Sequence, residues 1–263
     1  MNSSLRTSAT GMIAQQRMID VIANNLANVN TTAFKRSRVS FEDLLYETVQ
    51  GGQIVNYQGS GTLAPIQIGK GVRVAAVLRL HSQGAPELTQ RPLDFAIEGD
   101  GFFQVQRPDG TIAYTRDGSF TISDTGQLVT NGGYLVLPGI TIPPDASGIT
   151  VSPSGVVSIT GGGSTAPTEI GRIELARFLN PNGLLAIGEN QYVETAASGQ
   201  PIVGLPQEEG FGRLLQGTLE SSNVEIVQEM TDMIAAQRAY EINAKAIRAG
   251  EDMMQSADGI IIR

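Results

Sequence analysis

Residues 221–247 have the sequence SSNVEIVQEMTDMIAAQRAYEINAKAI, in which apolar side chains recur every seven residues. The main row begins at Leu219, and a companion row lies four residues further on. The main row continues through Ile226, Met233, Tyr240, Ile247 and Met254, and the companions are Met230, Gln237 and Ala244. Such a narrow apolar stripe predicts a long helix that packs against another helix. Ser222 and Glu225 form a capping box at its start, and we expect it to reach about residue 257, with Gly250 weakening it by about 1 kcal/mol.

The other end of the chain carries a matching pattern. Leu5, Met12, Ile19 and Leu26 recur every seven residues and predict a helix over residues 3–29. The first 33 residues contain few charges, and the outer positions of this helix are small and neutral, Asn24, Asn25 and Asn28 among them. A helix with one solvated face normally carries more charge. We therefore expect other copies of the chain to contact it on several sides, although the seams alone are equally compatible with packing on the chain's own β-rich region.

Between the two ends the apolar period changes to two. Val72, Val74, Ala76 and Leu78 alternate in this way, and later short runs do the same; the later runs include Phe103 with Val105, Tyr114 with Ile112, and Phe120 with Ile122. Asp-Gly and Asn-Gly turns separate them, as in hairpins. The predicted fold class is therefore α+β, with long terminal helices pairing as an antiparallel coiled-coil-like domain and an inserted, mainly antiparallel all-β domain. The expected boundaries are 1–34 with 220–263, 35–72 as an extended linker and arm, and 73–219 as the β-rich domain.

The stretch from Gln50 to Gly71 fits neither period, because it is rich in Gly, Gln and Ser and has few charges. By itself, this composition predicts a flexible or extended arm. The arm's candidate contact residues are Gln50, Tyr57, Leu63, Ile66 and Gly71. The alternative is a passive loop.

Composition excludes several classes of function. The chain of 263 residues has no cysteine and one histidine, His81, so Cys/His zinc sites and disulfides cannot form and no cofactor is expected. A net charge of -8 argues against a nucleic-acid partner. No apolar run is long enough to insert in a membrane, and no cleavable signal peptide is present at the start.

Some polar residues leave alternatives open. Asp94, Glu98 and Asp100 keep a glycosidase-like carboxylate pair conceivable, and a secreted β-rich hydrolase is the enzymatic alternative. His81 is best explained as structural because no second metal ligand lies near it. The basic cluster Lys35, Arg36 and Arg38 either contacts an acidic neighbour or is solvated.

Several motifs together resemble those of the flagellar rod and hook proteins. They are ANNLANVNTTAFKR at 23–36, FEDLLYETV at 41–49, GDGFFQV at 99–105, YTRDGSFTI at 114–122, IGENQYVET at 187–195 and the C-terminal motif quoted above. The resemblance spans nearly the whole chain. Within the family, the length, the 50–71 stretch and RLHSQG at 79–84 are most similar to the distal-rod members, with proximal-rod and hook proteins as the nearest alternatives.

This resemblance implies a non-enzymatic subunit of a rigid hollow helical tube that transmits motor torque to the hook. Its implied place is the basal body, from periplasm to outer membrane, and its implied route is the flagellar type III export apparatus. The implied partners are copies of itself, proximal-rod proteins, the hook protein, the P-ring and L-ring bushing and the rod cap. We expect assembly contacts at the residues of the two seams and the asparagines: Leu5, Met12, Ile19, Leu26, Asn24, Asn25, Asn28, Ile226, Met230, Met233, Gln237, Tyr240, Ala244 and Ile247.

Overall fold

The computed structural model describes residues 3–50, 66–161 and 164–261. The chain divides into two compact units. The first contains Met1–Ala27, Ser37–Arg79 and Glu225–Arg263, and the second contains Asn28–Arg36 and Leu80–Val224. The chain therefore passes from one unit to the other four times.

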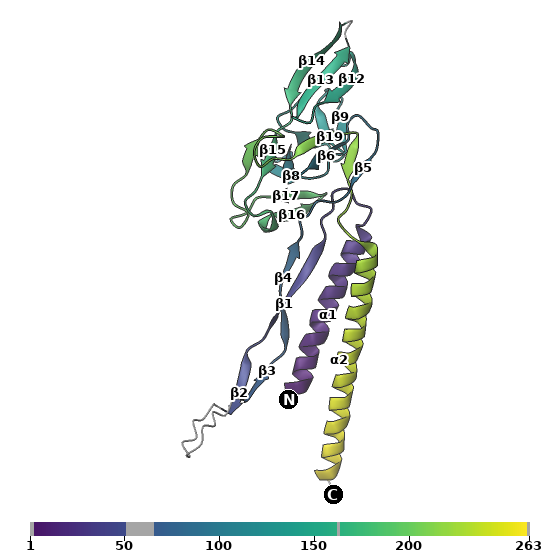
Figure 1. The fold of residues 1–263 in the computed structure, drawn as a ribbon. Coiled ribbons are helices and arrows are strands. Elements are labelled where there is room, and N and C mark those ends of the chain that lie inside the picture. The colour runs from purple at the N-terminus through teal and green to yellow at the C-terminus, as the bar shows by residue number, and fades with distance from the viewer. Residues whose placement is uncertain (1–2, 51–65, 162–163, 262–263) are drawn as a thin grey trace, which may run out of the picture. The chain divides into compact units, whose positions relative to one another are not determined.

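The first unit is built on two long helices, α1 (Ser3–Ala27) and α2 (Ile226–Ile261), which run antiparallel (Figure 1). Both predicted helices are confirmed, and α2 continues through Gly250 to Ile261, which corrects the expected end near residue 257. The start of α2 also differs slightly from the predicted one, because the helix begins at Ile226, after the predicted capping box of Ser222 and Glu225. Ser222 Oγ accepts a hydrogen bond from the Val224 N–H, so Ser222 shapes the turn before the helix.

Two β-ribbons complete this unit. β1 (Ser37–Asp43) pairs with β4 (Val72–Arg79), and a bulge interrupts the register between Ser40 and Phe41. β2 (Tyr46–Gln50) pairs with β3 (Ile66–Gly69). Gln50 and residues 66–69 of the predicted arm thus lie in paired strands, Gly71 lies between β3 and β4, and Tyr57 and Leu63 lie outside the described residues.

The second unit is made of short strands whose pairs, among the described residues, are all antiparallel. A large sheet has the order β16-β17-β8-β7-β11-β10-β9, and β15 joins β7 to β18; smaller sheets are β12-β13-β14, β19-β6 and β20-β5. The strands are β5 (Pro86–Leu88), β6 (Phe95–Glu98), β7 (Phe102–Gln106), β8 (Ile112–Thr115), β9 (Phe120–Ile122), β10 (Leu128–Thr130), β11 (Leu135–Val136), β12 (Ala146–Val151), β13 (Val156–Gly161), β14 (Ser164–Arg172), β15 (Leu175–Arg177), β16 (Leu185–Gly188), β17 (Gln191–Val193), β18 (Ile202–Gly204), β19 (Arg213–Gln216) and β20 (Thr218–Glu220). A 3₁₀ turn, η1, covers Pro181–Gly183.

The core of the second unit follows from the alternation along β7. Phe103 and Val105 point into the main apolar cluster, whereas Phe102 packs on the opposite face with Tyr114, Ala176, Phe178 and Tyr192. The larger cluster also contains Phe95, Ile97, Phe120, Ile173, Leu175 and Leu214. His81 packs edge-on against Phe102 and Tyr192. The predicted α+β class, with terminal helices in contact and an inserted antiparallel β region, is confirmed.

Candidate assembly interface

The contact between α1 and α2 is close because small residues lie along it. A Cβ added to Gly250 would lie 2.7 Å from Leu5 Cδ2, and one added to Gly11 would lie 3.1 Å from Asn243 Nδ2. At the other end of the pair, Asn25 Nδ2 donates to Glu229 Oε2 at 3.1 Å. Glycine at Gly250 therefore lets Leu5 fit against α2, which explains its place in the helix despite its low helix propensity.

The side of α1 that is most buried differs from the predicted apolar row. Ala14, Ile22 and Asn25 are buried, whereas the row members are half-buried: Leu5, Met12, Ile19 and Leu26. Asn24 is exposed and Asn28 is half-buried. The buried positions are spaced by eight and three residues, and Ala14 and Asn25 are too small or too polar to stand out when apolar residues are counted.

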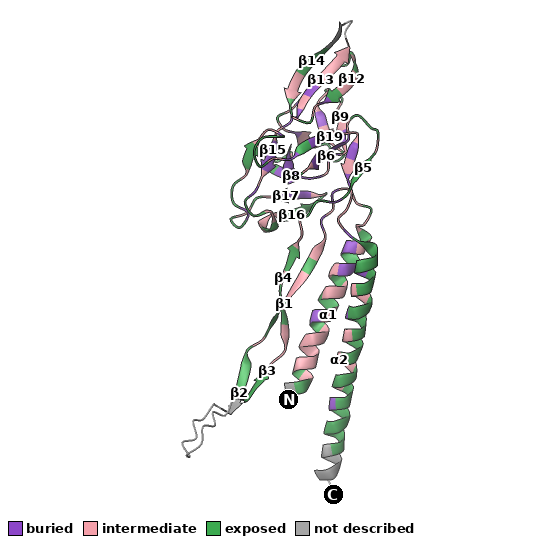
Figure 2. Ribbon diagram, viewed as in Figure 1, coloured by how far each residue is buried: buried purple, intermediate pink, exposed green. Residues whose placement is uncertain are grey.

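On α2 the buried positions are Glu229, Ala236 and Gly250, and the predicted positions lie around them. Met233, Ala244 and Ile247 are half-buried, and Gln237 is exposed. Ile226, Met230 and Tyr240 are 46%, 52% and 39% exposed, and so are further large apolar side chains that the seam did not include: Val227, Ile234, Ile242 and Met253. Figure 2 shows that most of α2 is exposed along its length.

Two asparagines hold the chain where it passes from one unit to the other at residues 36 and 37. In the first unit, Asn25 Oδ1 accepts from the Ser37 N–H at 2.9 Å, and Asn25 Nδ2 donates to the Ser37 carbonyl at 2.8 Å. In the second, Asn223 Oδ1 accepts from the Arg36 N–H at 2.7 Å, and Asn223 Nδ2 donates to the Leu80 carbonyl at 2.9 Å. Two consecutive backbone amides are therefore each fixed by a side-chain amide, which is 12 residues away for Asn25 and 187 residues away for Asn223.

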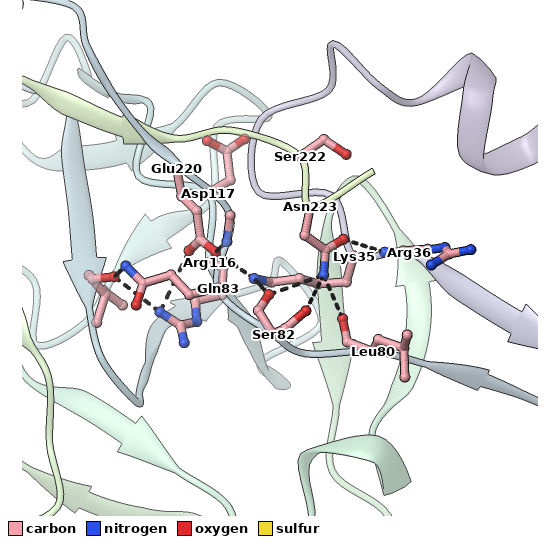
Figure 3. Close-up of polar contacts among 12 residues, drawn as sticks. Lys35, Arg36, Leu80, Ser82, Gln83, Arg116, Asp117, Glu220, Ser222 and Asn223 are labelled. Atoms are coloured by element: carbon pink, nitrogen blue, oxygen red, sulfur yellow. Dashed lines mark hydrogen bonds and ion pairs between the residues drawn. The ribbon is translucent and has the colours of Figure 1, made fainter. Parts of the chain in front are cut away.

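A buried ionic cluster lies beside Asn223 (Figure 3). Lys35 Nζ contacts Glu220 Oε1 at 2.5 Å and donates to the Ser82 carbonyl at 2.7 Å. Arg116 lies 3.6 Å from the other oxygen of Glu220, and all three charged side chains are at most 4% exposed. Burial lowers the pKa of Lys35 and of Arg116, and the Glu220 carboxylate opposes both shifts. Neither alternative offered for Lys35 holds, because its partner is an acid of the same chain.

The described part of the predicted arm is largely exposed. Ile66 is 53% exposed, and the side chain of Gln50 lies outside the described residues. Gly71 has φ +112, and a Cβ there would meet Thr10 Oγ1, which already accepts from the Val72 N–H. Only glycine fits this approach of the ribbon to α1.

Comparison with known proteins places these features in a family. Three family models match the chain: one for flagella basal body rod proteins at residues 5–35, one for the D1 domain of the flagellar hook protein FlgE/F/G at 96–159, and one for the C-terminal part of flagellar basal body rod FlgEFG proteins at 215–260. The flagellar basal-body rod protein FlgG of Caulobacter vibrioides is 49% identical over 96% of this chain and 97% of its own length. The chain belongs to the FlgG family of flagellar basal-body rod proteins.

Other FlgG proteins agree with this assignment. That of Borreliella burgdorferi is 50% identical over 99% of both chains, whereas the rod protein FlgF of Caulobacter vibrioides is 36% identical. The predictions of a distal-rod protein and of a non-enzymatic structural component are confirmed. As a FlgG-family member, the chain is a component of the basal-body rod, and its family implies assembly with rod and hook proteins. Within the described residues, no helix is both long and apolar enough to cross a membrane.

Proposed function

We propose that this protein polymerises through α1 and α2 into a rigid, hollow helical tube that carries motor torque to the hook. In this tube, residues 1–34 and 220–263 form the inner core, and residues 73–219 form the outer domain. The charged, exposed side of α2 lines the channel, since it is the better solvated of the two helices.

The observation that carries this proposal is the apolar surface left on the helix pair. Met230, Ile234 and Ile242 are each at least half exposed on α2, and Ile13 is 61% exposed on α1. Large exposed apolar side chains that gather on one element mark an interaction surface. Burying them against neighbouring copies would contribute about 25 cal/mol for each Å² of apolar surface removed from water.

The arm of residues 35–72 is proposed to join neighbouring copies. Ribbons of two strands are only marginally stable by themselves. Contact with a neighbour would stabilise the ribbon and would also resist sliding of one row of subunits past the next. Deleting residues 50–71 is expected to leave export intact and to give a bent or compliant rod, and straight rods of normal stiffness from this variant would contradict the proposal.

The specific flagellar partners that we propose follow from the family resemblance. They are the proximal-rod proteins, the hook protein, the P-ring and L-ring bushing and the rod cap. The proposed route to the rod is the flagellar type III export apparatus, without a cleaved signal peptide.

The test is electron microscopy of the full-length protein at high concentration. Met230→Glu places a charge on the exposed apolar surface of α2, where it should not disturb the monomer but should prevent tubes from forming. Leu179→Glu is the matched control, since Leu179 is 91% exposed in the second unit. Tubes from the wild type and the control but not from Met230→Glu support the proposal. Normal tubes from Met230→Glu, or from a chain without residues 1–33 and 222–263, contradict it.

A further inference from the structure

A polar pocket of about 350 Å³ lies in the second unit. It is formed by the end of β8, the turn between β10 and β11, and the turn between β16 and β17. Its lining residues are Thr115, Asp117, Ser119, Thr130, Asn131, Gly132, Tyr134, Glu189, Asn190 and Gln191. They include two acids and no base.

Most hydrogen-bond donors of this lining already have acceptors inside the protein. The Ser119 Oγ–H and N–H donate to Asp117 Oδ1 at 2.7 and 3.0 Å. Asn131 Nδ2 donates to Ser119 Oγ at 3.0 Å, and Asn190 Nδ2 donates to the Thr32 carbonyl at 3.0 Å. The carboxylates and side-chain amides of the lining still have acceptor positions available after these bonds are formed, because a carboxylate has about four acceptor positions and each side-chain amide has a carbonyl oxygen.

One acceptor is buried without a partner. Gln191 is 3% exposed, and its Oε1 has no hydrogen-bond partner within the described structure. Buried polar groups in folded proteins nearly always have one, so an unmatched acceptor on a residue that lines a pocket points to a ligand that donates.

The pocket is also suited to a positive charge. Tyr134 donates to Glu189, and the guanidinium carbon of Arg107 lies 5.6 Å from the centre of the Tyr134 ring, so this ring already attracts one guanidinium group. Burial raises the pKa of Asp117, and the hydrogen bonds that it accepts from Ser119 and Asn190 oppose this shift only in part. A bound cation would offset the remaining cost of its burial.

The turn that carries Glu189 is held in a demanding conformation. Glu189 and Asn190 have φ of 53° and 57°, in the left-handed region, and Gly188 before them has φ of 96°. Asn190 is fixed there, since Thr115 Oγ1 donates to its carbonyl at 2.8 Å. Such conformations persist where the surroundings impose them, and they gather at binding sites.

We propose that this pocket binds the guanidinium group of an arginine side chain presented by a partner protein. Guanidinium is a planar group with five N–H donors and no acceptor, which matches a lining that has acceptors to offer and few free donors. Glu189 and Asp117 supply the opposite charge, the Tyr134 ring borders the site, and Gln191 Oε1, which is buried in the free protein, accepts one N–H once its side chain turns towards the pocket. A saccharide fits less well, because it needs donors for its ring and hydroxyl oxygens. A metal ion fits less well too, because the described residues contain no group of three or more His, Cys, Asp or Glu side chains placed to hold one.

The test uses N-acetyl-L-argininamide as the probe with the full-length protein. Binding is measured by calorimetry and by changes in the side-chain amide NMR signals of Asn131 and Gln191. Its neutral isostere, N-acetyl-L-citrullinamide, is the ligand control. We expect saturable binding of the arginine probe, at least about 10-fold stronger than that of the citrulline probe, since charge-assisted hydrogen bonds are about twice as strong as neutral ones.

Three variants locate the site. Glu189→Gln and Gln191→Met should each weaken binding at least about 5-fold, one by removing charge and the other by removing the buried acceptor. Glu209→Gln removes an exposed carboxylate of the same unit that does not line the pocket, and it should leave binding unchanged. Equal binding of both probes, no saturable binding, or an equal loss in Glu209→Gln overturns the proposal. Binding of an N-acetylglucosamine disaccharide in place of the arginine probe would overturn it in favour of a saccharide site.

Discussion

The buried cluster around Glu220 predicts which of two substitutions destabilises the protein more. Glu220 faces Lys35 at 2.5 Å and Arg116 at 3.6 Å, and it also accepts from the Gly84 N–H at 2.8 Å. Changing Glu220 to Gln removes the only acid of the cluster and leaves two buried cations. Changing Lys35 to Met leaves Glu220 with Arg116 and the Gly84 amide. Glu220→Gln should therefore destabilise the second unit more than Lys35→Met does.

The magnitudes follow from burial. At an effective dielectric constant of 20, unit charges at these two separations attract by about 7 and about 5 kcal/mol before desolvation is counted. Desolvation offsets much of this, and the measured cost of breaking a buried pair is about 3–5 kcal/mol. We expect Glu220→Gln to lower the free energy of unfolding by about 4 kcal/mol and Lys35→Met by about 2 kcal/mol.

The assay is urea unfolding at pH 7, followed by tyrosine fluorescence, which suits a chain without tryptophan. The matched control is Glu98→Gln, because Glu98 pairs with Arg213 at 2.6 Å in an exposed position, where water screens the charges. It should leave the unfolding midpoint nearly unchanged. A cost for Glu220→Gln no larger than that for Lys35→Met, or no larger than that for the control, would refute the reasoning.

Three further predictions concern other parts of the chain. Replacing Gly250 by Leu should weaken pairing of the helices, seen as a lower melting temperature by circular dichroism, and Leu5→Ala in the same chain should restore part of the loss, because the added side chain takes the space of Leu5. Met233→Asp should leave the monomer soluble but stop tube growth in electron microscopy, since it places a charge in the seam at a cost of a few kcal/mol. Because the folded-state pKa of Asp117 is raised above its ordinary 3.8, its charge destabilises the fold at neutral pH, and stability is regained as pH falls through the folded pKa. Asp117→Asn should therefore gain stability relative to wild type at pH 7, and the difference measured by urea unfolding should shrink towards pH 4.

The sequence predicts the helices and strands well because they follow regular periods. The heptads at both ends indicated α1 and α2, and Pro108-Asp109-Gly110 indicated the hairpin between β7 and β8, where the Gly110 N–H bonds to the Arg107 carbonyl. Periodicity alone missed one point. Gly250 is a buried contact position for Leu5, and no pattern within one helix can reveal what its partner needs.

The polar contacts could not be predicted in the same way. Asn25 and Glu229 are 204 residues apart, and Lys35 and Glu220 are 185 residues apart. Nothing in the local sequence couples such pairs, because their meeting depends on the completed fold. Lys35 was recognised as part of a basic cluster, but the cluster suggested an exposed surface rather than a buried pair. Asn25 was singled out for its neutral polar character, and whether it also takes part in assembly stays a prediction.

The distance along the chain between the two helices has a consequence for the order of folding. When a polypeptide is made from its N-terminus, α1 appears first and α2 last, so α1 has no partner until nearly the whole chain exists. Closing so long a loop is entropically unfavourable unless the intervening residues have already folded into something compact. We therefore expect the β-rich unit to form before the helices meet. A chain cut short by about forty residues keeps a complete β-rich unit but leaves Asn25 without Glu229 and Leu5 without Gly250, and so the two helices pair only after α2 has been made.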